Sequence, residues 1–179
     1  MTPVAITTVE IPTFETERLR LRAPGWSDFE TYAAFRTSER ARGVGGPYSR
    51  GSAFDSLADM IGHWHLRGYG RWLVADKKTD EPLGAVGLMY PEDWPEPEIA
   101  WTVFANAEGK GVAFEAAVFT RKYAYQVLGW TTLISCTLPE NRRSMALAER
   151  MGAVWESDFE HPDLGTLNIW RHIGPEALH

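Results

Sequence analysis

The sequence predicts an α/β protein of the α+β type, in which helices flank a central mixed sheet that is mostly antiparallel. The first observation behind this prediction is the order of the elements along the chain, β α α β β β α β α β β, which alternates runs of strands with helices. The second is the composition: 179 residues, 44% of them hydrophobic and 23% charged, are enough to fill the core of one compact domain.

The N-terminal residues divide into an extension and the start of the domain. Residues 1–15 are apolar and β-branched but contain two prolines, so an edge strand, a dimer arm and a loose tail remain alternatives for this extension. Residues 16–175 are assigned to a single domain. Its first strand is predicted at Arg18–Arg22, where leucines alternate with arginines at the period of a strand with one wet face.

Cap signals predict the two helices that follow. Ser27 begins a sequence with the spacing of a capping box, which predicts a helix to about Ser38. Ser52 repeats this signal after a glycine-rich connector, and apolar residues at helical spacing predict a second helix up to Gly68. The remaining elements are predicted as strands at 71–76, 83–90 and 98–104, a helix at 111–128, a strand at 131–138, a helix at 141–151, and strands at 154–159 and 166–173.

The charge of the chain argues against several classes of partner. A formal net charge of −6 and a pI near 5.4 disfavour nonspecific binding of nucleic acid or of an anionic membrane, because both need a basic face. The single cysteine, Cys136, cannot form an internal disulfide, and we find neither a secretory signal nor an apolar run that could span a bilayer. These features favour a cytoplasmic protein. The five histidines lack the spacing of a zinc site, so no metal is expected.

The segment from Ile99 to Gly111 has the features of a phosphate-binding turn. A strand leads into Gly109-Lys110-Gly111 and then into a long helix, whose first amides have no intrahelical partner and whose dipole is positive at this end. A tight strand-to-helix turn without a ligand explains the glycines equally well. A Rossmann fingerprint is excluded because Phe114 occupies the third glycine position, and a Walker loop is excluded because no Gly-Lys-Ser or Gly-Lys-Thr is present.

Several motifs in the same order resemble those of the GNAT superfamily of N-acetyltransferases. Glu98–Trp101 is similar to the fourth strand of these enzymes, Gly109–Ala116 to their acetyl-CoA pyrophosphate loop, and Pro139–Ser144 to the start of a later helix that contacts CoA. The segments Thr16–Arg22 and Gly68–Trp72 resemble the ribosomal-protein N-acetyltransferase branch of the superfamily. The resemblance covers residues 16 to about 155.

This resemblance implies a direct transfer of an acetyl group from acetyl-CoA to a primary amine, and it implies the residues that take part. Glu98 is the candidate general base, and Ser144 is the candidate partner of the departing sulfur. The residues expected to contact the co-substrate acetyl-CoA are Val103, Phe104, Glu108, Gly109, Lys110, Gly111, Val112, Ala113, Asn141, Arg142 and Ser144. A backbone N–H near Phe104, freed by a bulge, is expected to stabilise the oxyanion.

Two positions depart from the family pattern. Asn106 stands where the pyrophosphate motif usually has Arg or Gln, so backbone contacts must suffice there. Ala148 stands where many relatives have a tyrosine that acts as a general acid, so another group must protonate the thiolate. This loss leaves two alternatives to an enzyme: a noncatalytic acyl-CoA-binding module, and a structural protein that shares only the fold.

The acceptor is left open among protein N-termini, amino acids, polyamines and aminoglycoside-like drugs, because substrate loops vary independently of the fold. The acidic residues Glu92, Asp93 and Glu96 are expected to attract a cationic amine. The oligomeric state is also open, and a homodimer formed through the terminal strands is one alternative.

Overall fold

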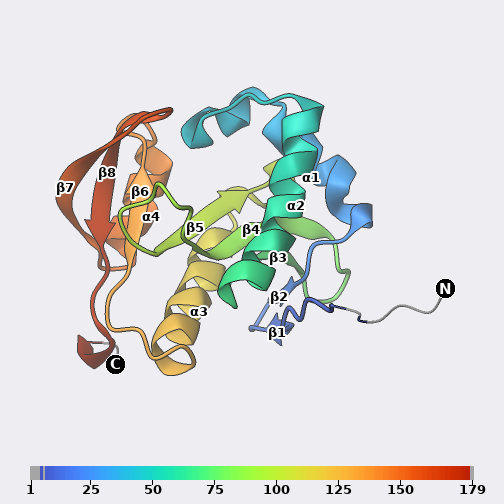
Figure 1. Ribbon diagram of the computed structural model, residues 1–179, viewed down its shortest axis with the longest axis horizontal. Coiled ribbons are helices and arrows are strands. Elements are labelled where there is room, and N and C mark those ends of the chain that lie inside the picture. The colour runs from blue at the N-terminus through green and yellow to red at the C-terminus, as the bar shows by residue number, and fades with distance from the viewer. Residues whose placement is uncertain (1–4, 6, 178–179) are drawn as a thin grey trace.

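The computed structural model describes residue 5 and residues 7–177, which form a single eight-stranded sheet with helices on both faces (Figure 1). The strands lie in the order β1-β2-β3-β4-β5-β6-β8-β7. The strands are β1 (Phe14–Glu15), β2 (Leu19–Arg22), β3 (Arg71–Asp76), β4 (Pro82–Met89), β5 (Glu98–Val103), β6 (Ile134–Thr137), β7 (Val154–His161) and β8 (Gly165–Arg171). The helices are α1 (Phe29–Arg36), α2 (Arg50–Arg67), α3 (Val112–Gln126) and α4 (Arg142–Arg150), and the 3-10 helices are η1 (Trp26–Asp28), η2 (Glu39–Val44), η3 (Ala105–Ala107) and η4 (Pro175–Ala177).

The sheet is antiparallel except where β5 meets β6. That parallel contact consists of one residue pair, Glu98 with Ile134, and beyond it the two strands diverge. On its other edge β5 pairs continuously with β4, from Met89 opposite Glu98 to Gly84 opposite Val103. The predicted mixed and mostly antiparallel sheet is therefore confirmed, and its one parallel contact opens a gap along β5.

Two apolar layers hold the sheet between the helices. Trp72 on β3 points to the α3 face and is fully buried with Leu21 and Ala116. The next residue, Leu73, points to the opposite face, where it packs with Tyr32 of α1. Because successive side chains of a strand point to opposite faces, a strand that is buried on both sides carries an unbroken apolar run.

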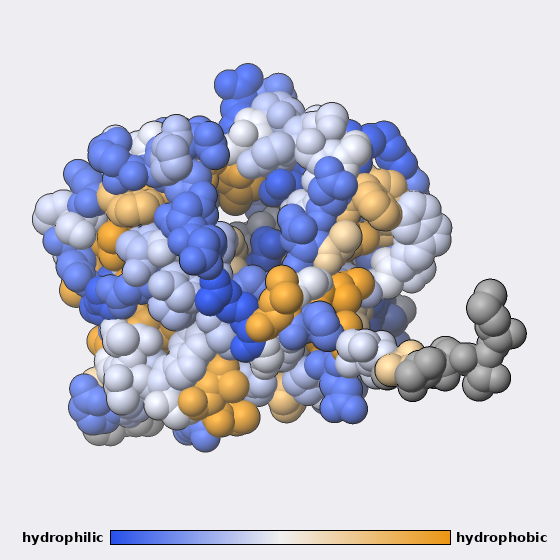
Figure 2. Space-filling model, viewed as in Figure 1, coloured by the Kyte–Doolittle hydropathy of each residue, from blue (hydrophilic) through white to orange (hydrophobic). Residues whose placement is uncertain are grey.

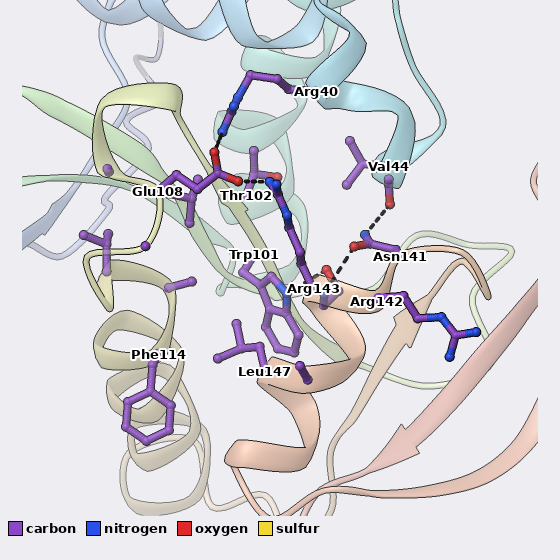
Figure 3. A pocket seen from close by; sticks show the side chains of 18 of the residues that line it. Arg40, Val44, Trp101, Thr102, Glu108, Phe114, Asn141, Arg142, Arg143 and Leu147 are labelled. Carbon is purple, nitrogen blue, oxygen red and sulfur yellow. Dashed lines mark hydrogen bonds and ion pairs between the residues drawn. The ribbon is translucent and has the colours of Figure 1, made fainter.

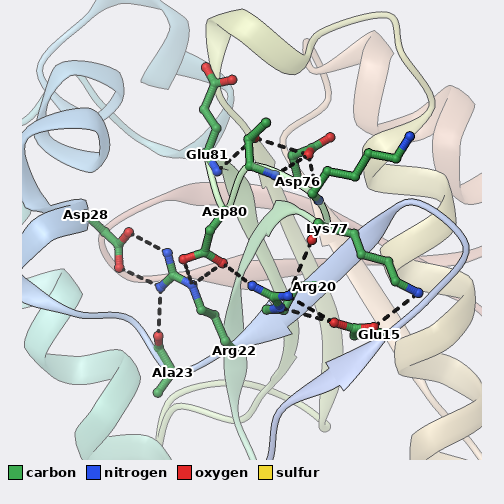
Figure 4. A network of polar contacts seen from close by, with 11 residues as sticks. Glu15, Arg20, Arg22, Ala23, Asp28, Asp76, Lys77, Asp80 and Glu81 are labelled. Atoms are coloured by element: carbon green, nitrogen blue, oxygen red, sulfur yellow. Dashed lines mark hydrogen bonds and ion pairs between the residues drawn. The ribbon is translucent and has the colours of Figure 1, made fainter.

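An ionic network ties the start of α1 to the edge of the sheet (Figure 4). Arg22 makes two contacts of 2.9 Å with the buried carboxylate of Asp28, and Asp28 accepts the N–H of Gly25 at 2.7 Å. Arg20 and Arg22 also share Asp80, and Arg20 pairs with Glu15. The arginines of the predicted wet face thus fix the position of α1, which forms one wall of the site described below.

The cap residues differ from those predicted. Ser27 lies inside η1, and Asp28 closes the cap by accepting the Gly25 N–H. The helix α2 begins earlier than predicted, because the hydroxyl of Ser49 accepts the N–H of Ser52 at 3.0 Å. Gly68 ends this helix in the left-handed conformation, with φ of 75°, as predicted.

Part of the predicted extension packs on the domain. Phe14 belongs to the edge strand β1, Val9 and Ile11 pack against the core, and the carbonyl of Pro12 accepts the indole N–H of Trp72 at 2.8 Å. Residues 1–4 and 6 of this extension lie outside the described residues. Within the described chain, every helix is too short or too polar to cross a membrane.

Candidate active site

Two neighbouring cavities that share lining residues lie where β5 and β6 diverge, and Figure 2 shows the molecule hollowed on this side. The outer cavity, of about 1080 Å³, is bounded by η2, the end of β5, the 107–111 turn, and the first turns of α3 and α4. The inner cavity, of about 260 Å³, lies beside it against α1, β3 and the β7–β8 hairpin. Residues that line both cavities are Gly43, Val44, Trp101, Thr102, Asn141 and Ser144. Two ligands can therefore meet across one shared wall.

The turn before α3 has the geometry of an anion-binding site. Gly109 and Gly111 have φ of 73° and 75°, a region that side chains with a Cβ rarely adopt. The N–H of Glu115 makes the first bond back into the helix, at 3.1 Å to the carbonyl of Gly111, so the amides of residues 112–114 lack intrahelical partners. Val112 and Ala113, two of the residues predicted to contact acetyl-CoA, line the outer cavity there.

Glu108 connects cationic side chains from two sides of the outer cavity. Its carboxylate forms ion pairs with Arg40 of η2 and with Arg143 of α4 (Figure 3). Arg142 also lines the cavity but points away from Glu108. Lys110, by contrast, is exposed and lies outside the lining, and its carbonyl accepts a hydrogen bond from Arg18 at 3.0 Å. Positive charge therefore gathers at the outer cavity mainly through arginines.

Asn141 joins the two sides of the cleft. Its side-chain oxygen caps α4 by accepting the N–H of Ser144 at 3.2 Å. Its amide nitrogen donates to the carbonyl of Gly43 in η2 at 2.8 Å, a contact visible beside Val44 in Figure 3. The predicted helix-cap role is therefore present, and the amide group also bridges the cleft.

The open edge of β5 presents backbone amides to the gap. Backbone groups of successive residues in a strand point to opposite edges, and the Ile99 carbonyl accepts Ser135 Oγ on the β6 side at 2.7 Å. Trp101 and Val103 are two and four residues after Ile99, so their amides point to the same edge and face the gap. The amide of Phe104 points to the opposite edge. The Phe104 N–H donates to the carbonyl of Leu83 at 2.8 Å, and its buried side chain packs away from both cavities.

The bulge expected near Phe104 does not occur in the pairing of β4 with β5. The register of β4 with β5 is unbroken from Glu98 to Val103, so nothing disturbs the pairing at this point. The free amides arise instead because β6 turns away from β5 after a single residue pair. Of the two predicted contact residues at the end of this strand, Val103 lines the outer cavity and Phe104 does not.

Glu98 is a buried carboxyl that opens on the inner cavity. It is 4% exposed, and its Oε2 accepts the N–H of Cys136 at 2.7 Å. Burial raises its pKa from 4.5 to about 7, although the hydrogen bond from Cys136 acts in the opposite direction. Within the described residues Glu98 forms no ion pair, so its proton can exchange near neutral pH.

The proposed partner of the sulfur lies in the wall between the cavities. Ser144 Oγ accepts the indole N–H of Trp101 at 3.1 Å, which leaves its own hydrogen free to be donated. Ala148, one turn further along α4, is completely buried with Ala153 and Trp170. A tyrosine at this position would have to displace that packing, so Ser144 is the polar side chain that α4 offers to both cavities.

The acidic residues before β5 do not line either cavity. Glu92 pairs with Arg67 and Glu96 pairs with Arg171, at 3.2 Å and 2.7 Å. Asp93 contacts His161 Nε2 at 2.9 Å. The expected attraction of a cationic amine by these acids is therefore not supported by their positions.

The group formed by Asp93, His161 and Asp163 was not foreseen from the spacing of the histidines. Its potential ligand atoms lie within 4.8 Å of one another. His161 Nδ1 already accepts the N–H groups of Asp163 and Leu164, and its Nε2 bonds Asp93, so both ring nitrogens are engaged.

Sequence reasoning missed the arginines that η2, α1 and β3 contribute. Arg40 and Arg42 line the outer cavity, and Arg36 and Arg71 line the inner one. The pattern of arginines beside the glycine-rich connector at 43–46 was a signal for the outer pair. Arg36 and Arg71 had no such signal, because the fold alone brings a helix end and a strand start together.

A mixed sheet that opens at one parallel contact, with a glycine-containing turn and free helix amides at the gap and a buried carboxyl beside it, is the architecture of an acyltransferase fold. The family described as Acetyltransferase (GNAT) domain matches residues 18–154. The chain belongs to the GNAT acetyltransferase family and is an N-acetyltransferase.

Solved structures support this assignment. An acetyltransferase from Agrobacterium tumefaciens str. C58 is 35% identical, with a TM-score of 0.84 over 95% of this chain and 99% of that one. A ribosomal-protein-S5-alanine acetyltransferase from Vibrio fischeri is 17% identical, with a TM-score of 0.67 over 94% and 100%. A ribosomal L7/L12 alpha-N-protein acetyltransferase, solved with coenzyme A, is 18% identical, with a TM-score of 0.68 over 88% and 95%. The similarity to the last two structures shows a shared fold and nothing further.

Proposed function

We propose that the protein transfers the acetyl group of acetyl-CoA to a primary amine by direct attack, with acetyl-CoA in the outer cavity and the amine in the inner one. The observation that carries this proposal is the wall that the two cavities share, with the carboxyl of Glu98 on its inner side. No covalent intermediate with the protein is needed, because both reactants reach the same gap.

The outer cavity suits a polyanion of the size of CoA. The pyrophosphate accepts hydrogen bonds from the free amides at the start of α3, where the helix dipole is positive. Arg40 and Arg143 supply positive charge to the phosphates, which compete with Glu108 for these two side chains. The amide of Trp101 or Val103 donates to the thioester carbonyl and stabilises the negative charge that develops on its oxygen.

Glu98 removes the proton that makes the amine unreactive. A primary amine with an ordinary pKa of about 10.4 is largely protonated at pH 7, so it must lose a proton before its nitrogen can attack. A carboxylate with a pKa of about 7 accepts that proton without being fully protonated beforehand.

The remaining steps complete the exchange of groups. The nitrogen forms a bond to the carbonyl carbon, and the carbon–sulfur bond breaks. The hydroxyl of Ser144, which lies in the shared wall and is oriented by Trp101, gives its proton to the departing sulfur, and its oxygen takes the second proton of the nitrogen, so the hydroxyl is restored. The products are an amide and the free thiol of CoA.

The alternative hypothesis of a noncatalytic binding module loses support, because Glu98 faces a cavity and has no ion-pair partner in the described chain.

The test is a thiol-release assay with acetyl-CoA and a panel of primary amines, with the acetylated amine identified by mass spectrometry. We expect wild-type protein to form both products in equal amounts and Glu98→Gln to lose at least a hundredfold in rate. Glu149→Gln, an exposed glutamate outside both cavities, is the matched control and should retain the wild-type rate. Thiol release that does not depend on any amine would contradict the proposal.

A further inference from the structure

The inner cavity carries an excess of positive charge that the proposed chemistry does not use. Its charged lining residues are Arg36, Arg71 and Glu98, and the remaining lining is apolar or neutral. Even with Glu98 ionised, two cations face one anion. Because burial raises the pKa of Glu98 to about 7, this carboxyl is neutral in much of the population at neutral pH, which increases the excess.

Neither arginine of the inner cavity has an anionic partner among the described residues. Arg36 stacks over the ring of Tyr48, with its Cζ 3.8 Å from the ring centroid, and its buried Nε has no hydrogen-bond partner in the described chain. Arg71 forms no ion pair in the described chain. Its charge lowers the pKa of Glu98 and so opposes the effect of burial on that carboxyl.

Most arginines of this protein form ion pairs with an acid. Arg121, Arg142 and Arg150 also lack an acidic partner among the described residues, but the buried Arg121 donates to the carbonyl of Met151 at 2.6 Å. Arginines that form ion pairs with an acid are Arg18, Arg20, Arg22, Arg40, Arg42, Arg50, Arg67, Arg143 and Arg171. Several of these are far more exposed than Arg36 and Arg71, both of which are partly buried. A partly buried guanidinium that lacks an anion loses hydration without compensation, so an anion from outside is favoured at this place.

The indole of Trp94 also lines this cavity, and its N–H lies close enough to Glu98 to lower the pKa of that carboxyl. This donor is therefore directed at Glu98. Guanidinium groups are donors only, so Arg36 and Arg71 define a site for an acceptor such as a carboxylate.

We infer that the amine acetylated by this protein carries a carboxylate, which Arg36 and Arg71 hold while the amino group faces Glu98. This inference rests on the proposed function and names its class of substrate. Arginine suits this role because its planar donor groups match a carboxylate in two parallel hydrogen bonds. The cavity of about 260 Å³ is below the roughly 300–1,000 Å³ of sites for larger ligands, so it fits a free amino acid or the first residues of an acidic peptide.

The experiment compares matched pairs of amines that differ in charge and adds one cationic amine. The substrates are glutamate and its diamide, two peptides of equal length that begin Asp-Glu or Asn-Gln, and spermidine as a cationic amine. Each is assayed for kcat/KM with wild type, Arg71→Gln, Arg71→Lys and Arg36→Gln, and with Arg50→Gln as a control far from the cavity lining. Circular dichroism and thermal melting establish that each variant is folded.

We expect wild type to prefer the acidic member of a pair by at least tenfold, and we expect this preference to vanish in Arg71→Gln and return in part in Arg71→Lys. Arg50→Gln should keep it. Equal rates for the acidic and amidated members, or a preference for spermidine, would overturn the inference while leaving the acetyltransferase proposal intact. Whether glutamate or the acidic peptide reacts faster identifies the source of the carboxylate.

A binding measurement separates this inference from the proposed chemistry. The N-acetylated forms of the same glutamate and peptide pairs cannot react, so calorimetric titration with them reports the site alone. Binding of the acidic forms that weakens at least tenfold in Arg71→Gln supports the inference even if no amine is acetylated, a result that would refute only the proposed function. Failure of wild type to bind any acidic form, or equal binding of the acidic and amidated forms, would overturn the inference of a carboxylate site.

Discussion

Replacing Glu98 by glutamine should weaken catalysis and strengthen the fold at the same time. A rise in pKa from 4.5 to about 7 corresponds to roughly 3 kcal/mol at about 1.4 kcal/mol per pH unit. The folded state holds this proton more tightly than the unfolded chain, so the stability contributed by Glu98 is greatest below pH 4.5 and is lost as pH rises to about 7. Glu98→Gln removes that dependence, because its amide oxygen can still accept the Cys136 N–H.

The assay is urea unfolding at several pH values, together with kcat/KM as a function of pH. At pH 8 the variant should be more stable than wild type by up to roughly 3 kcal/mol, and the difference should disappear below pH 4.5. Wild-type kcat/KM should fall about tenfold per pH unit below pH 7, because that limb reports the free enzyme's base. The reasoning is refuted if Glu98→Gln is destabilised equally at all pH values, or if its rate keeps the same acidic limb.

Three further predictions concern the outer cavity and the core. Glu108→Gln should strengthen acetyl-CoA binding several-fold in calorimetry, because it frees Arg40 and Arg143 for phosphate, and unchanged or weaker binding would contradict this. Gly111→Ala forces a Cβ into φ of 75°, so denaturant unfolding should show a loss of about 1–2 kcal/mol, and no loss would exclude the strain. Trp72→Ala empties a fully buried site and should lower the free energy of unfolding by about 3–5 kcal/mol in urea, whereas a loss below about 1 kcal/mol would show that the core collapses around it.

The periodicity of the chain was enough to predict the elements and their order. Strand β3 begins and ends at Arg71 and Asp76, as its apolar run and the polar turn after it predict. Errors arose where local signals compete, as at Ser27, whose predicted cap role is taken by Asp28 because Arg22 holds that carboxylate in place. Such competition depends on a contact between a strand and a helix start, which local sequence does not encode.

The parts of the candidate site that lie within one continuous segment of chain could be predicted from the sequence. The turn at Gly109–Gly111 and the start of α4 carry their own motifs, so their positions could be read from the sequence. The divergence of β5 from β6, which frees the amide of Val103 in place of Phe104, is a property of sheet topology. The meeting of Arg36 and Arg71 depends on tertiary packing in the same way.

The most direct test of the account is calorimetric titration of the protein with acetyl-CoA, beside Gly111→Trp, whose bulk fills the turn before α3. We predict a single saturable site in wild type and no measurable binding in Gly111→Trp when its circular dichroism spectrum is unchanged. Absence of binding in wild type, or equal binding in the folded variant, would contradict the assignment of acetyl-CoA to the outer cavity.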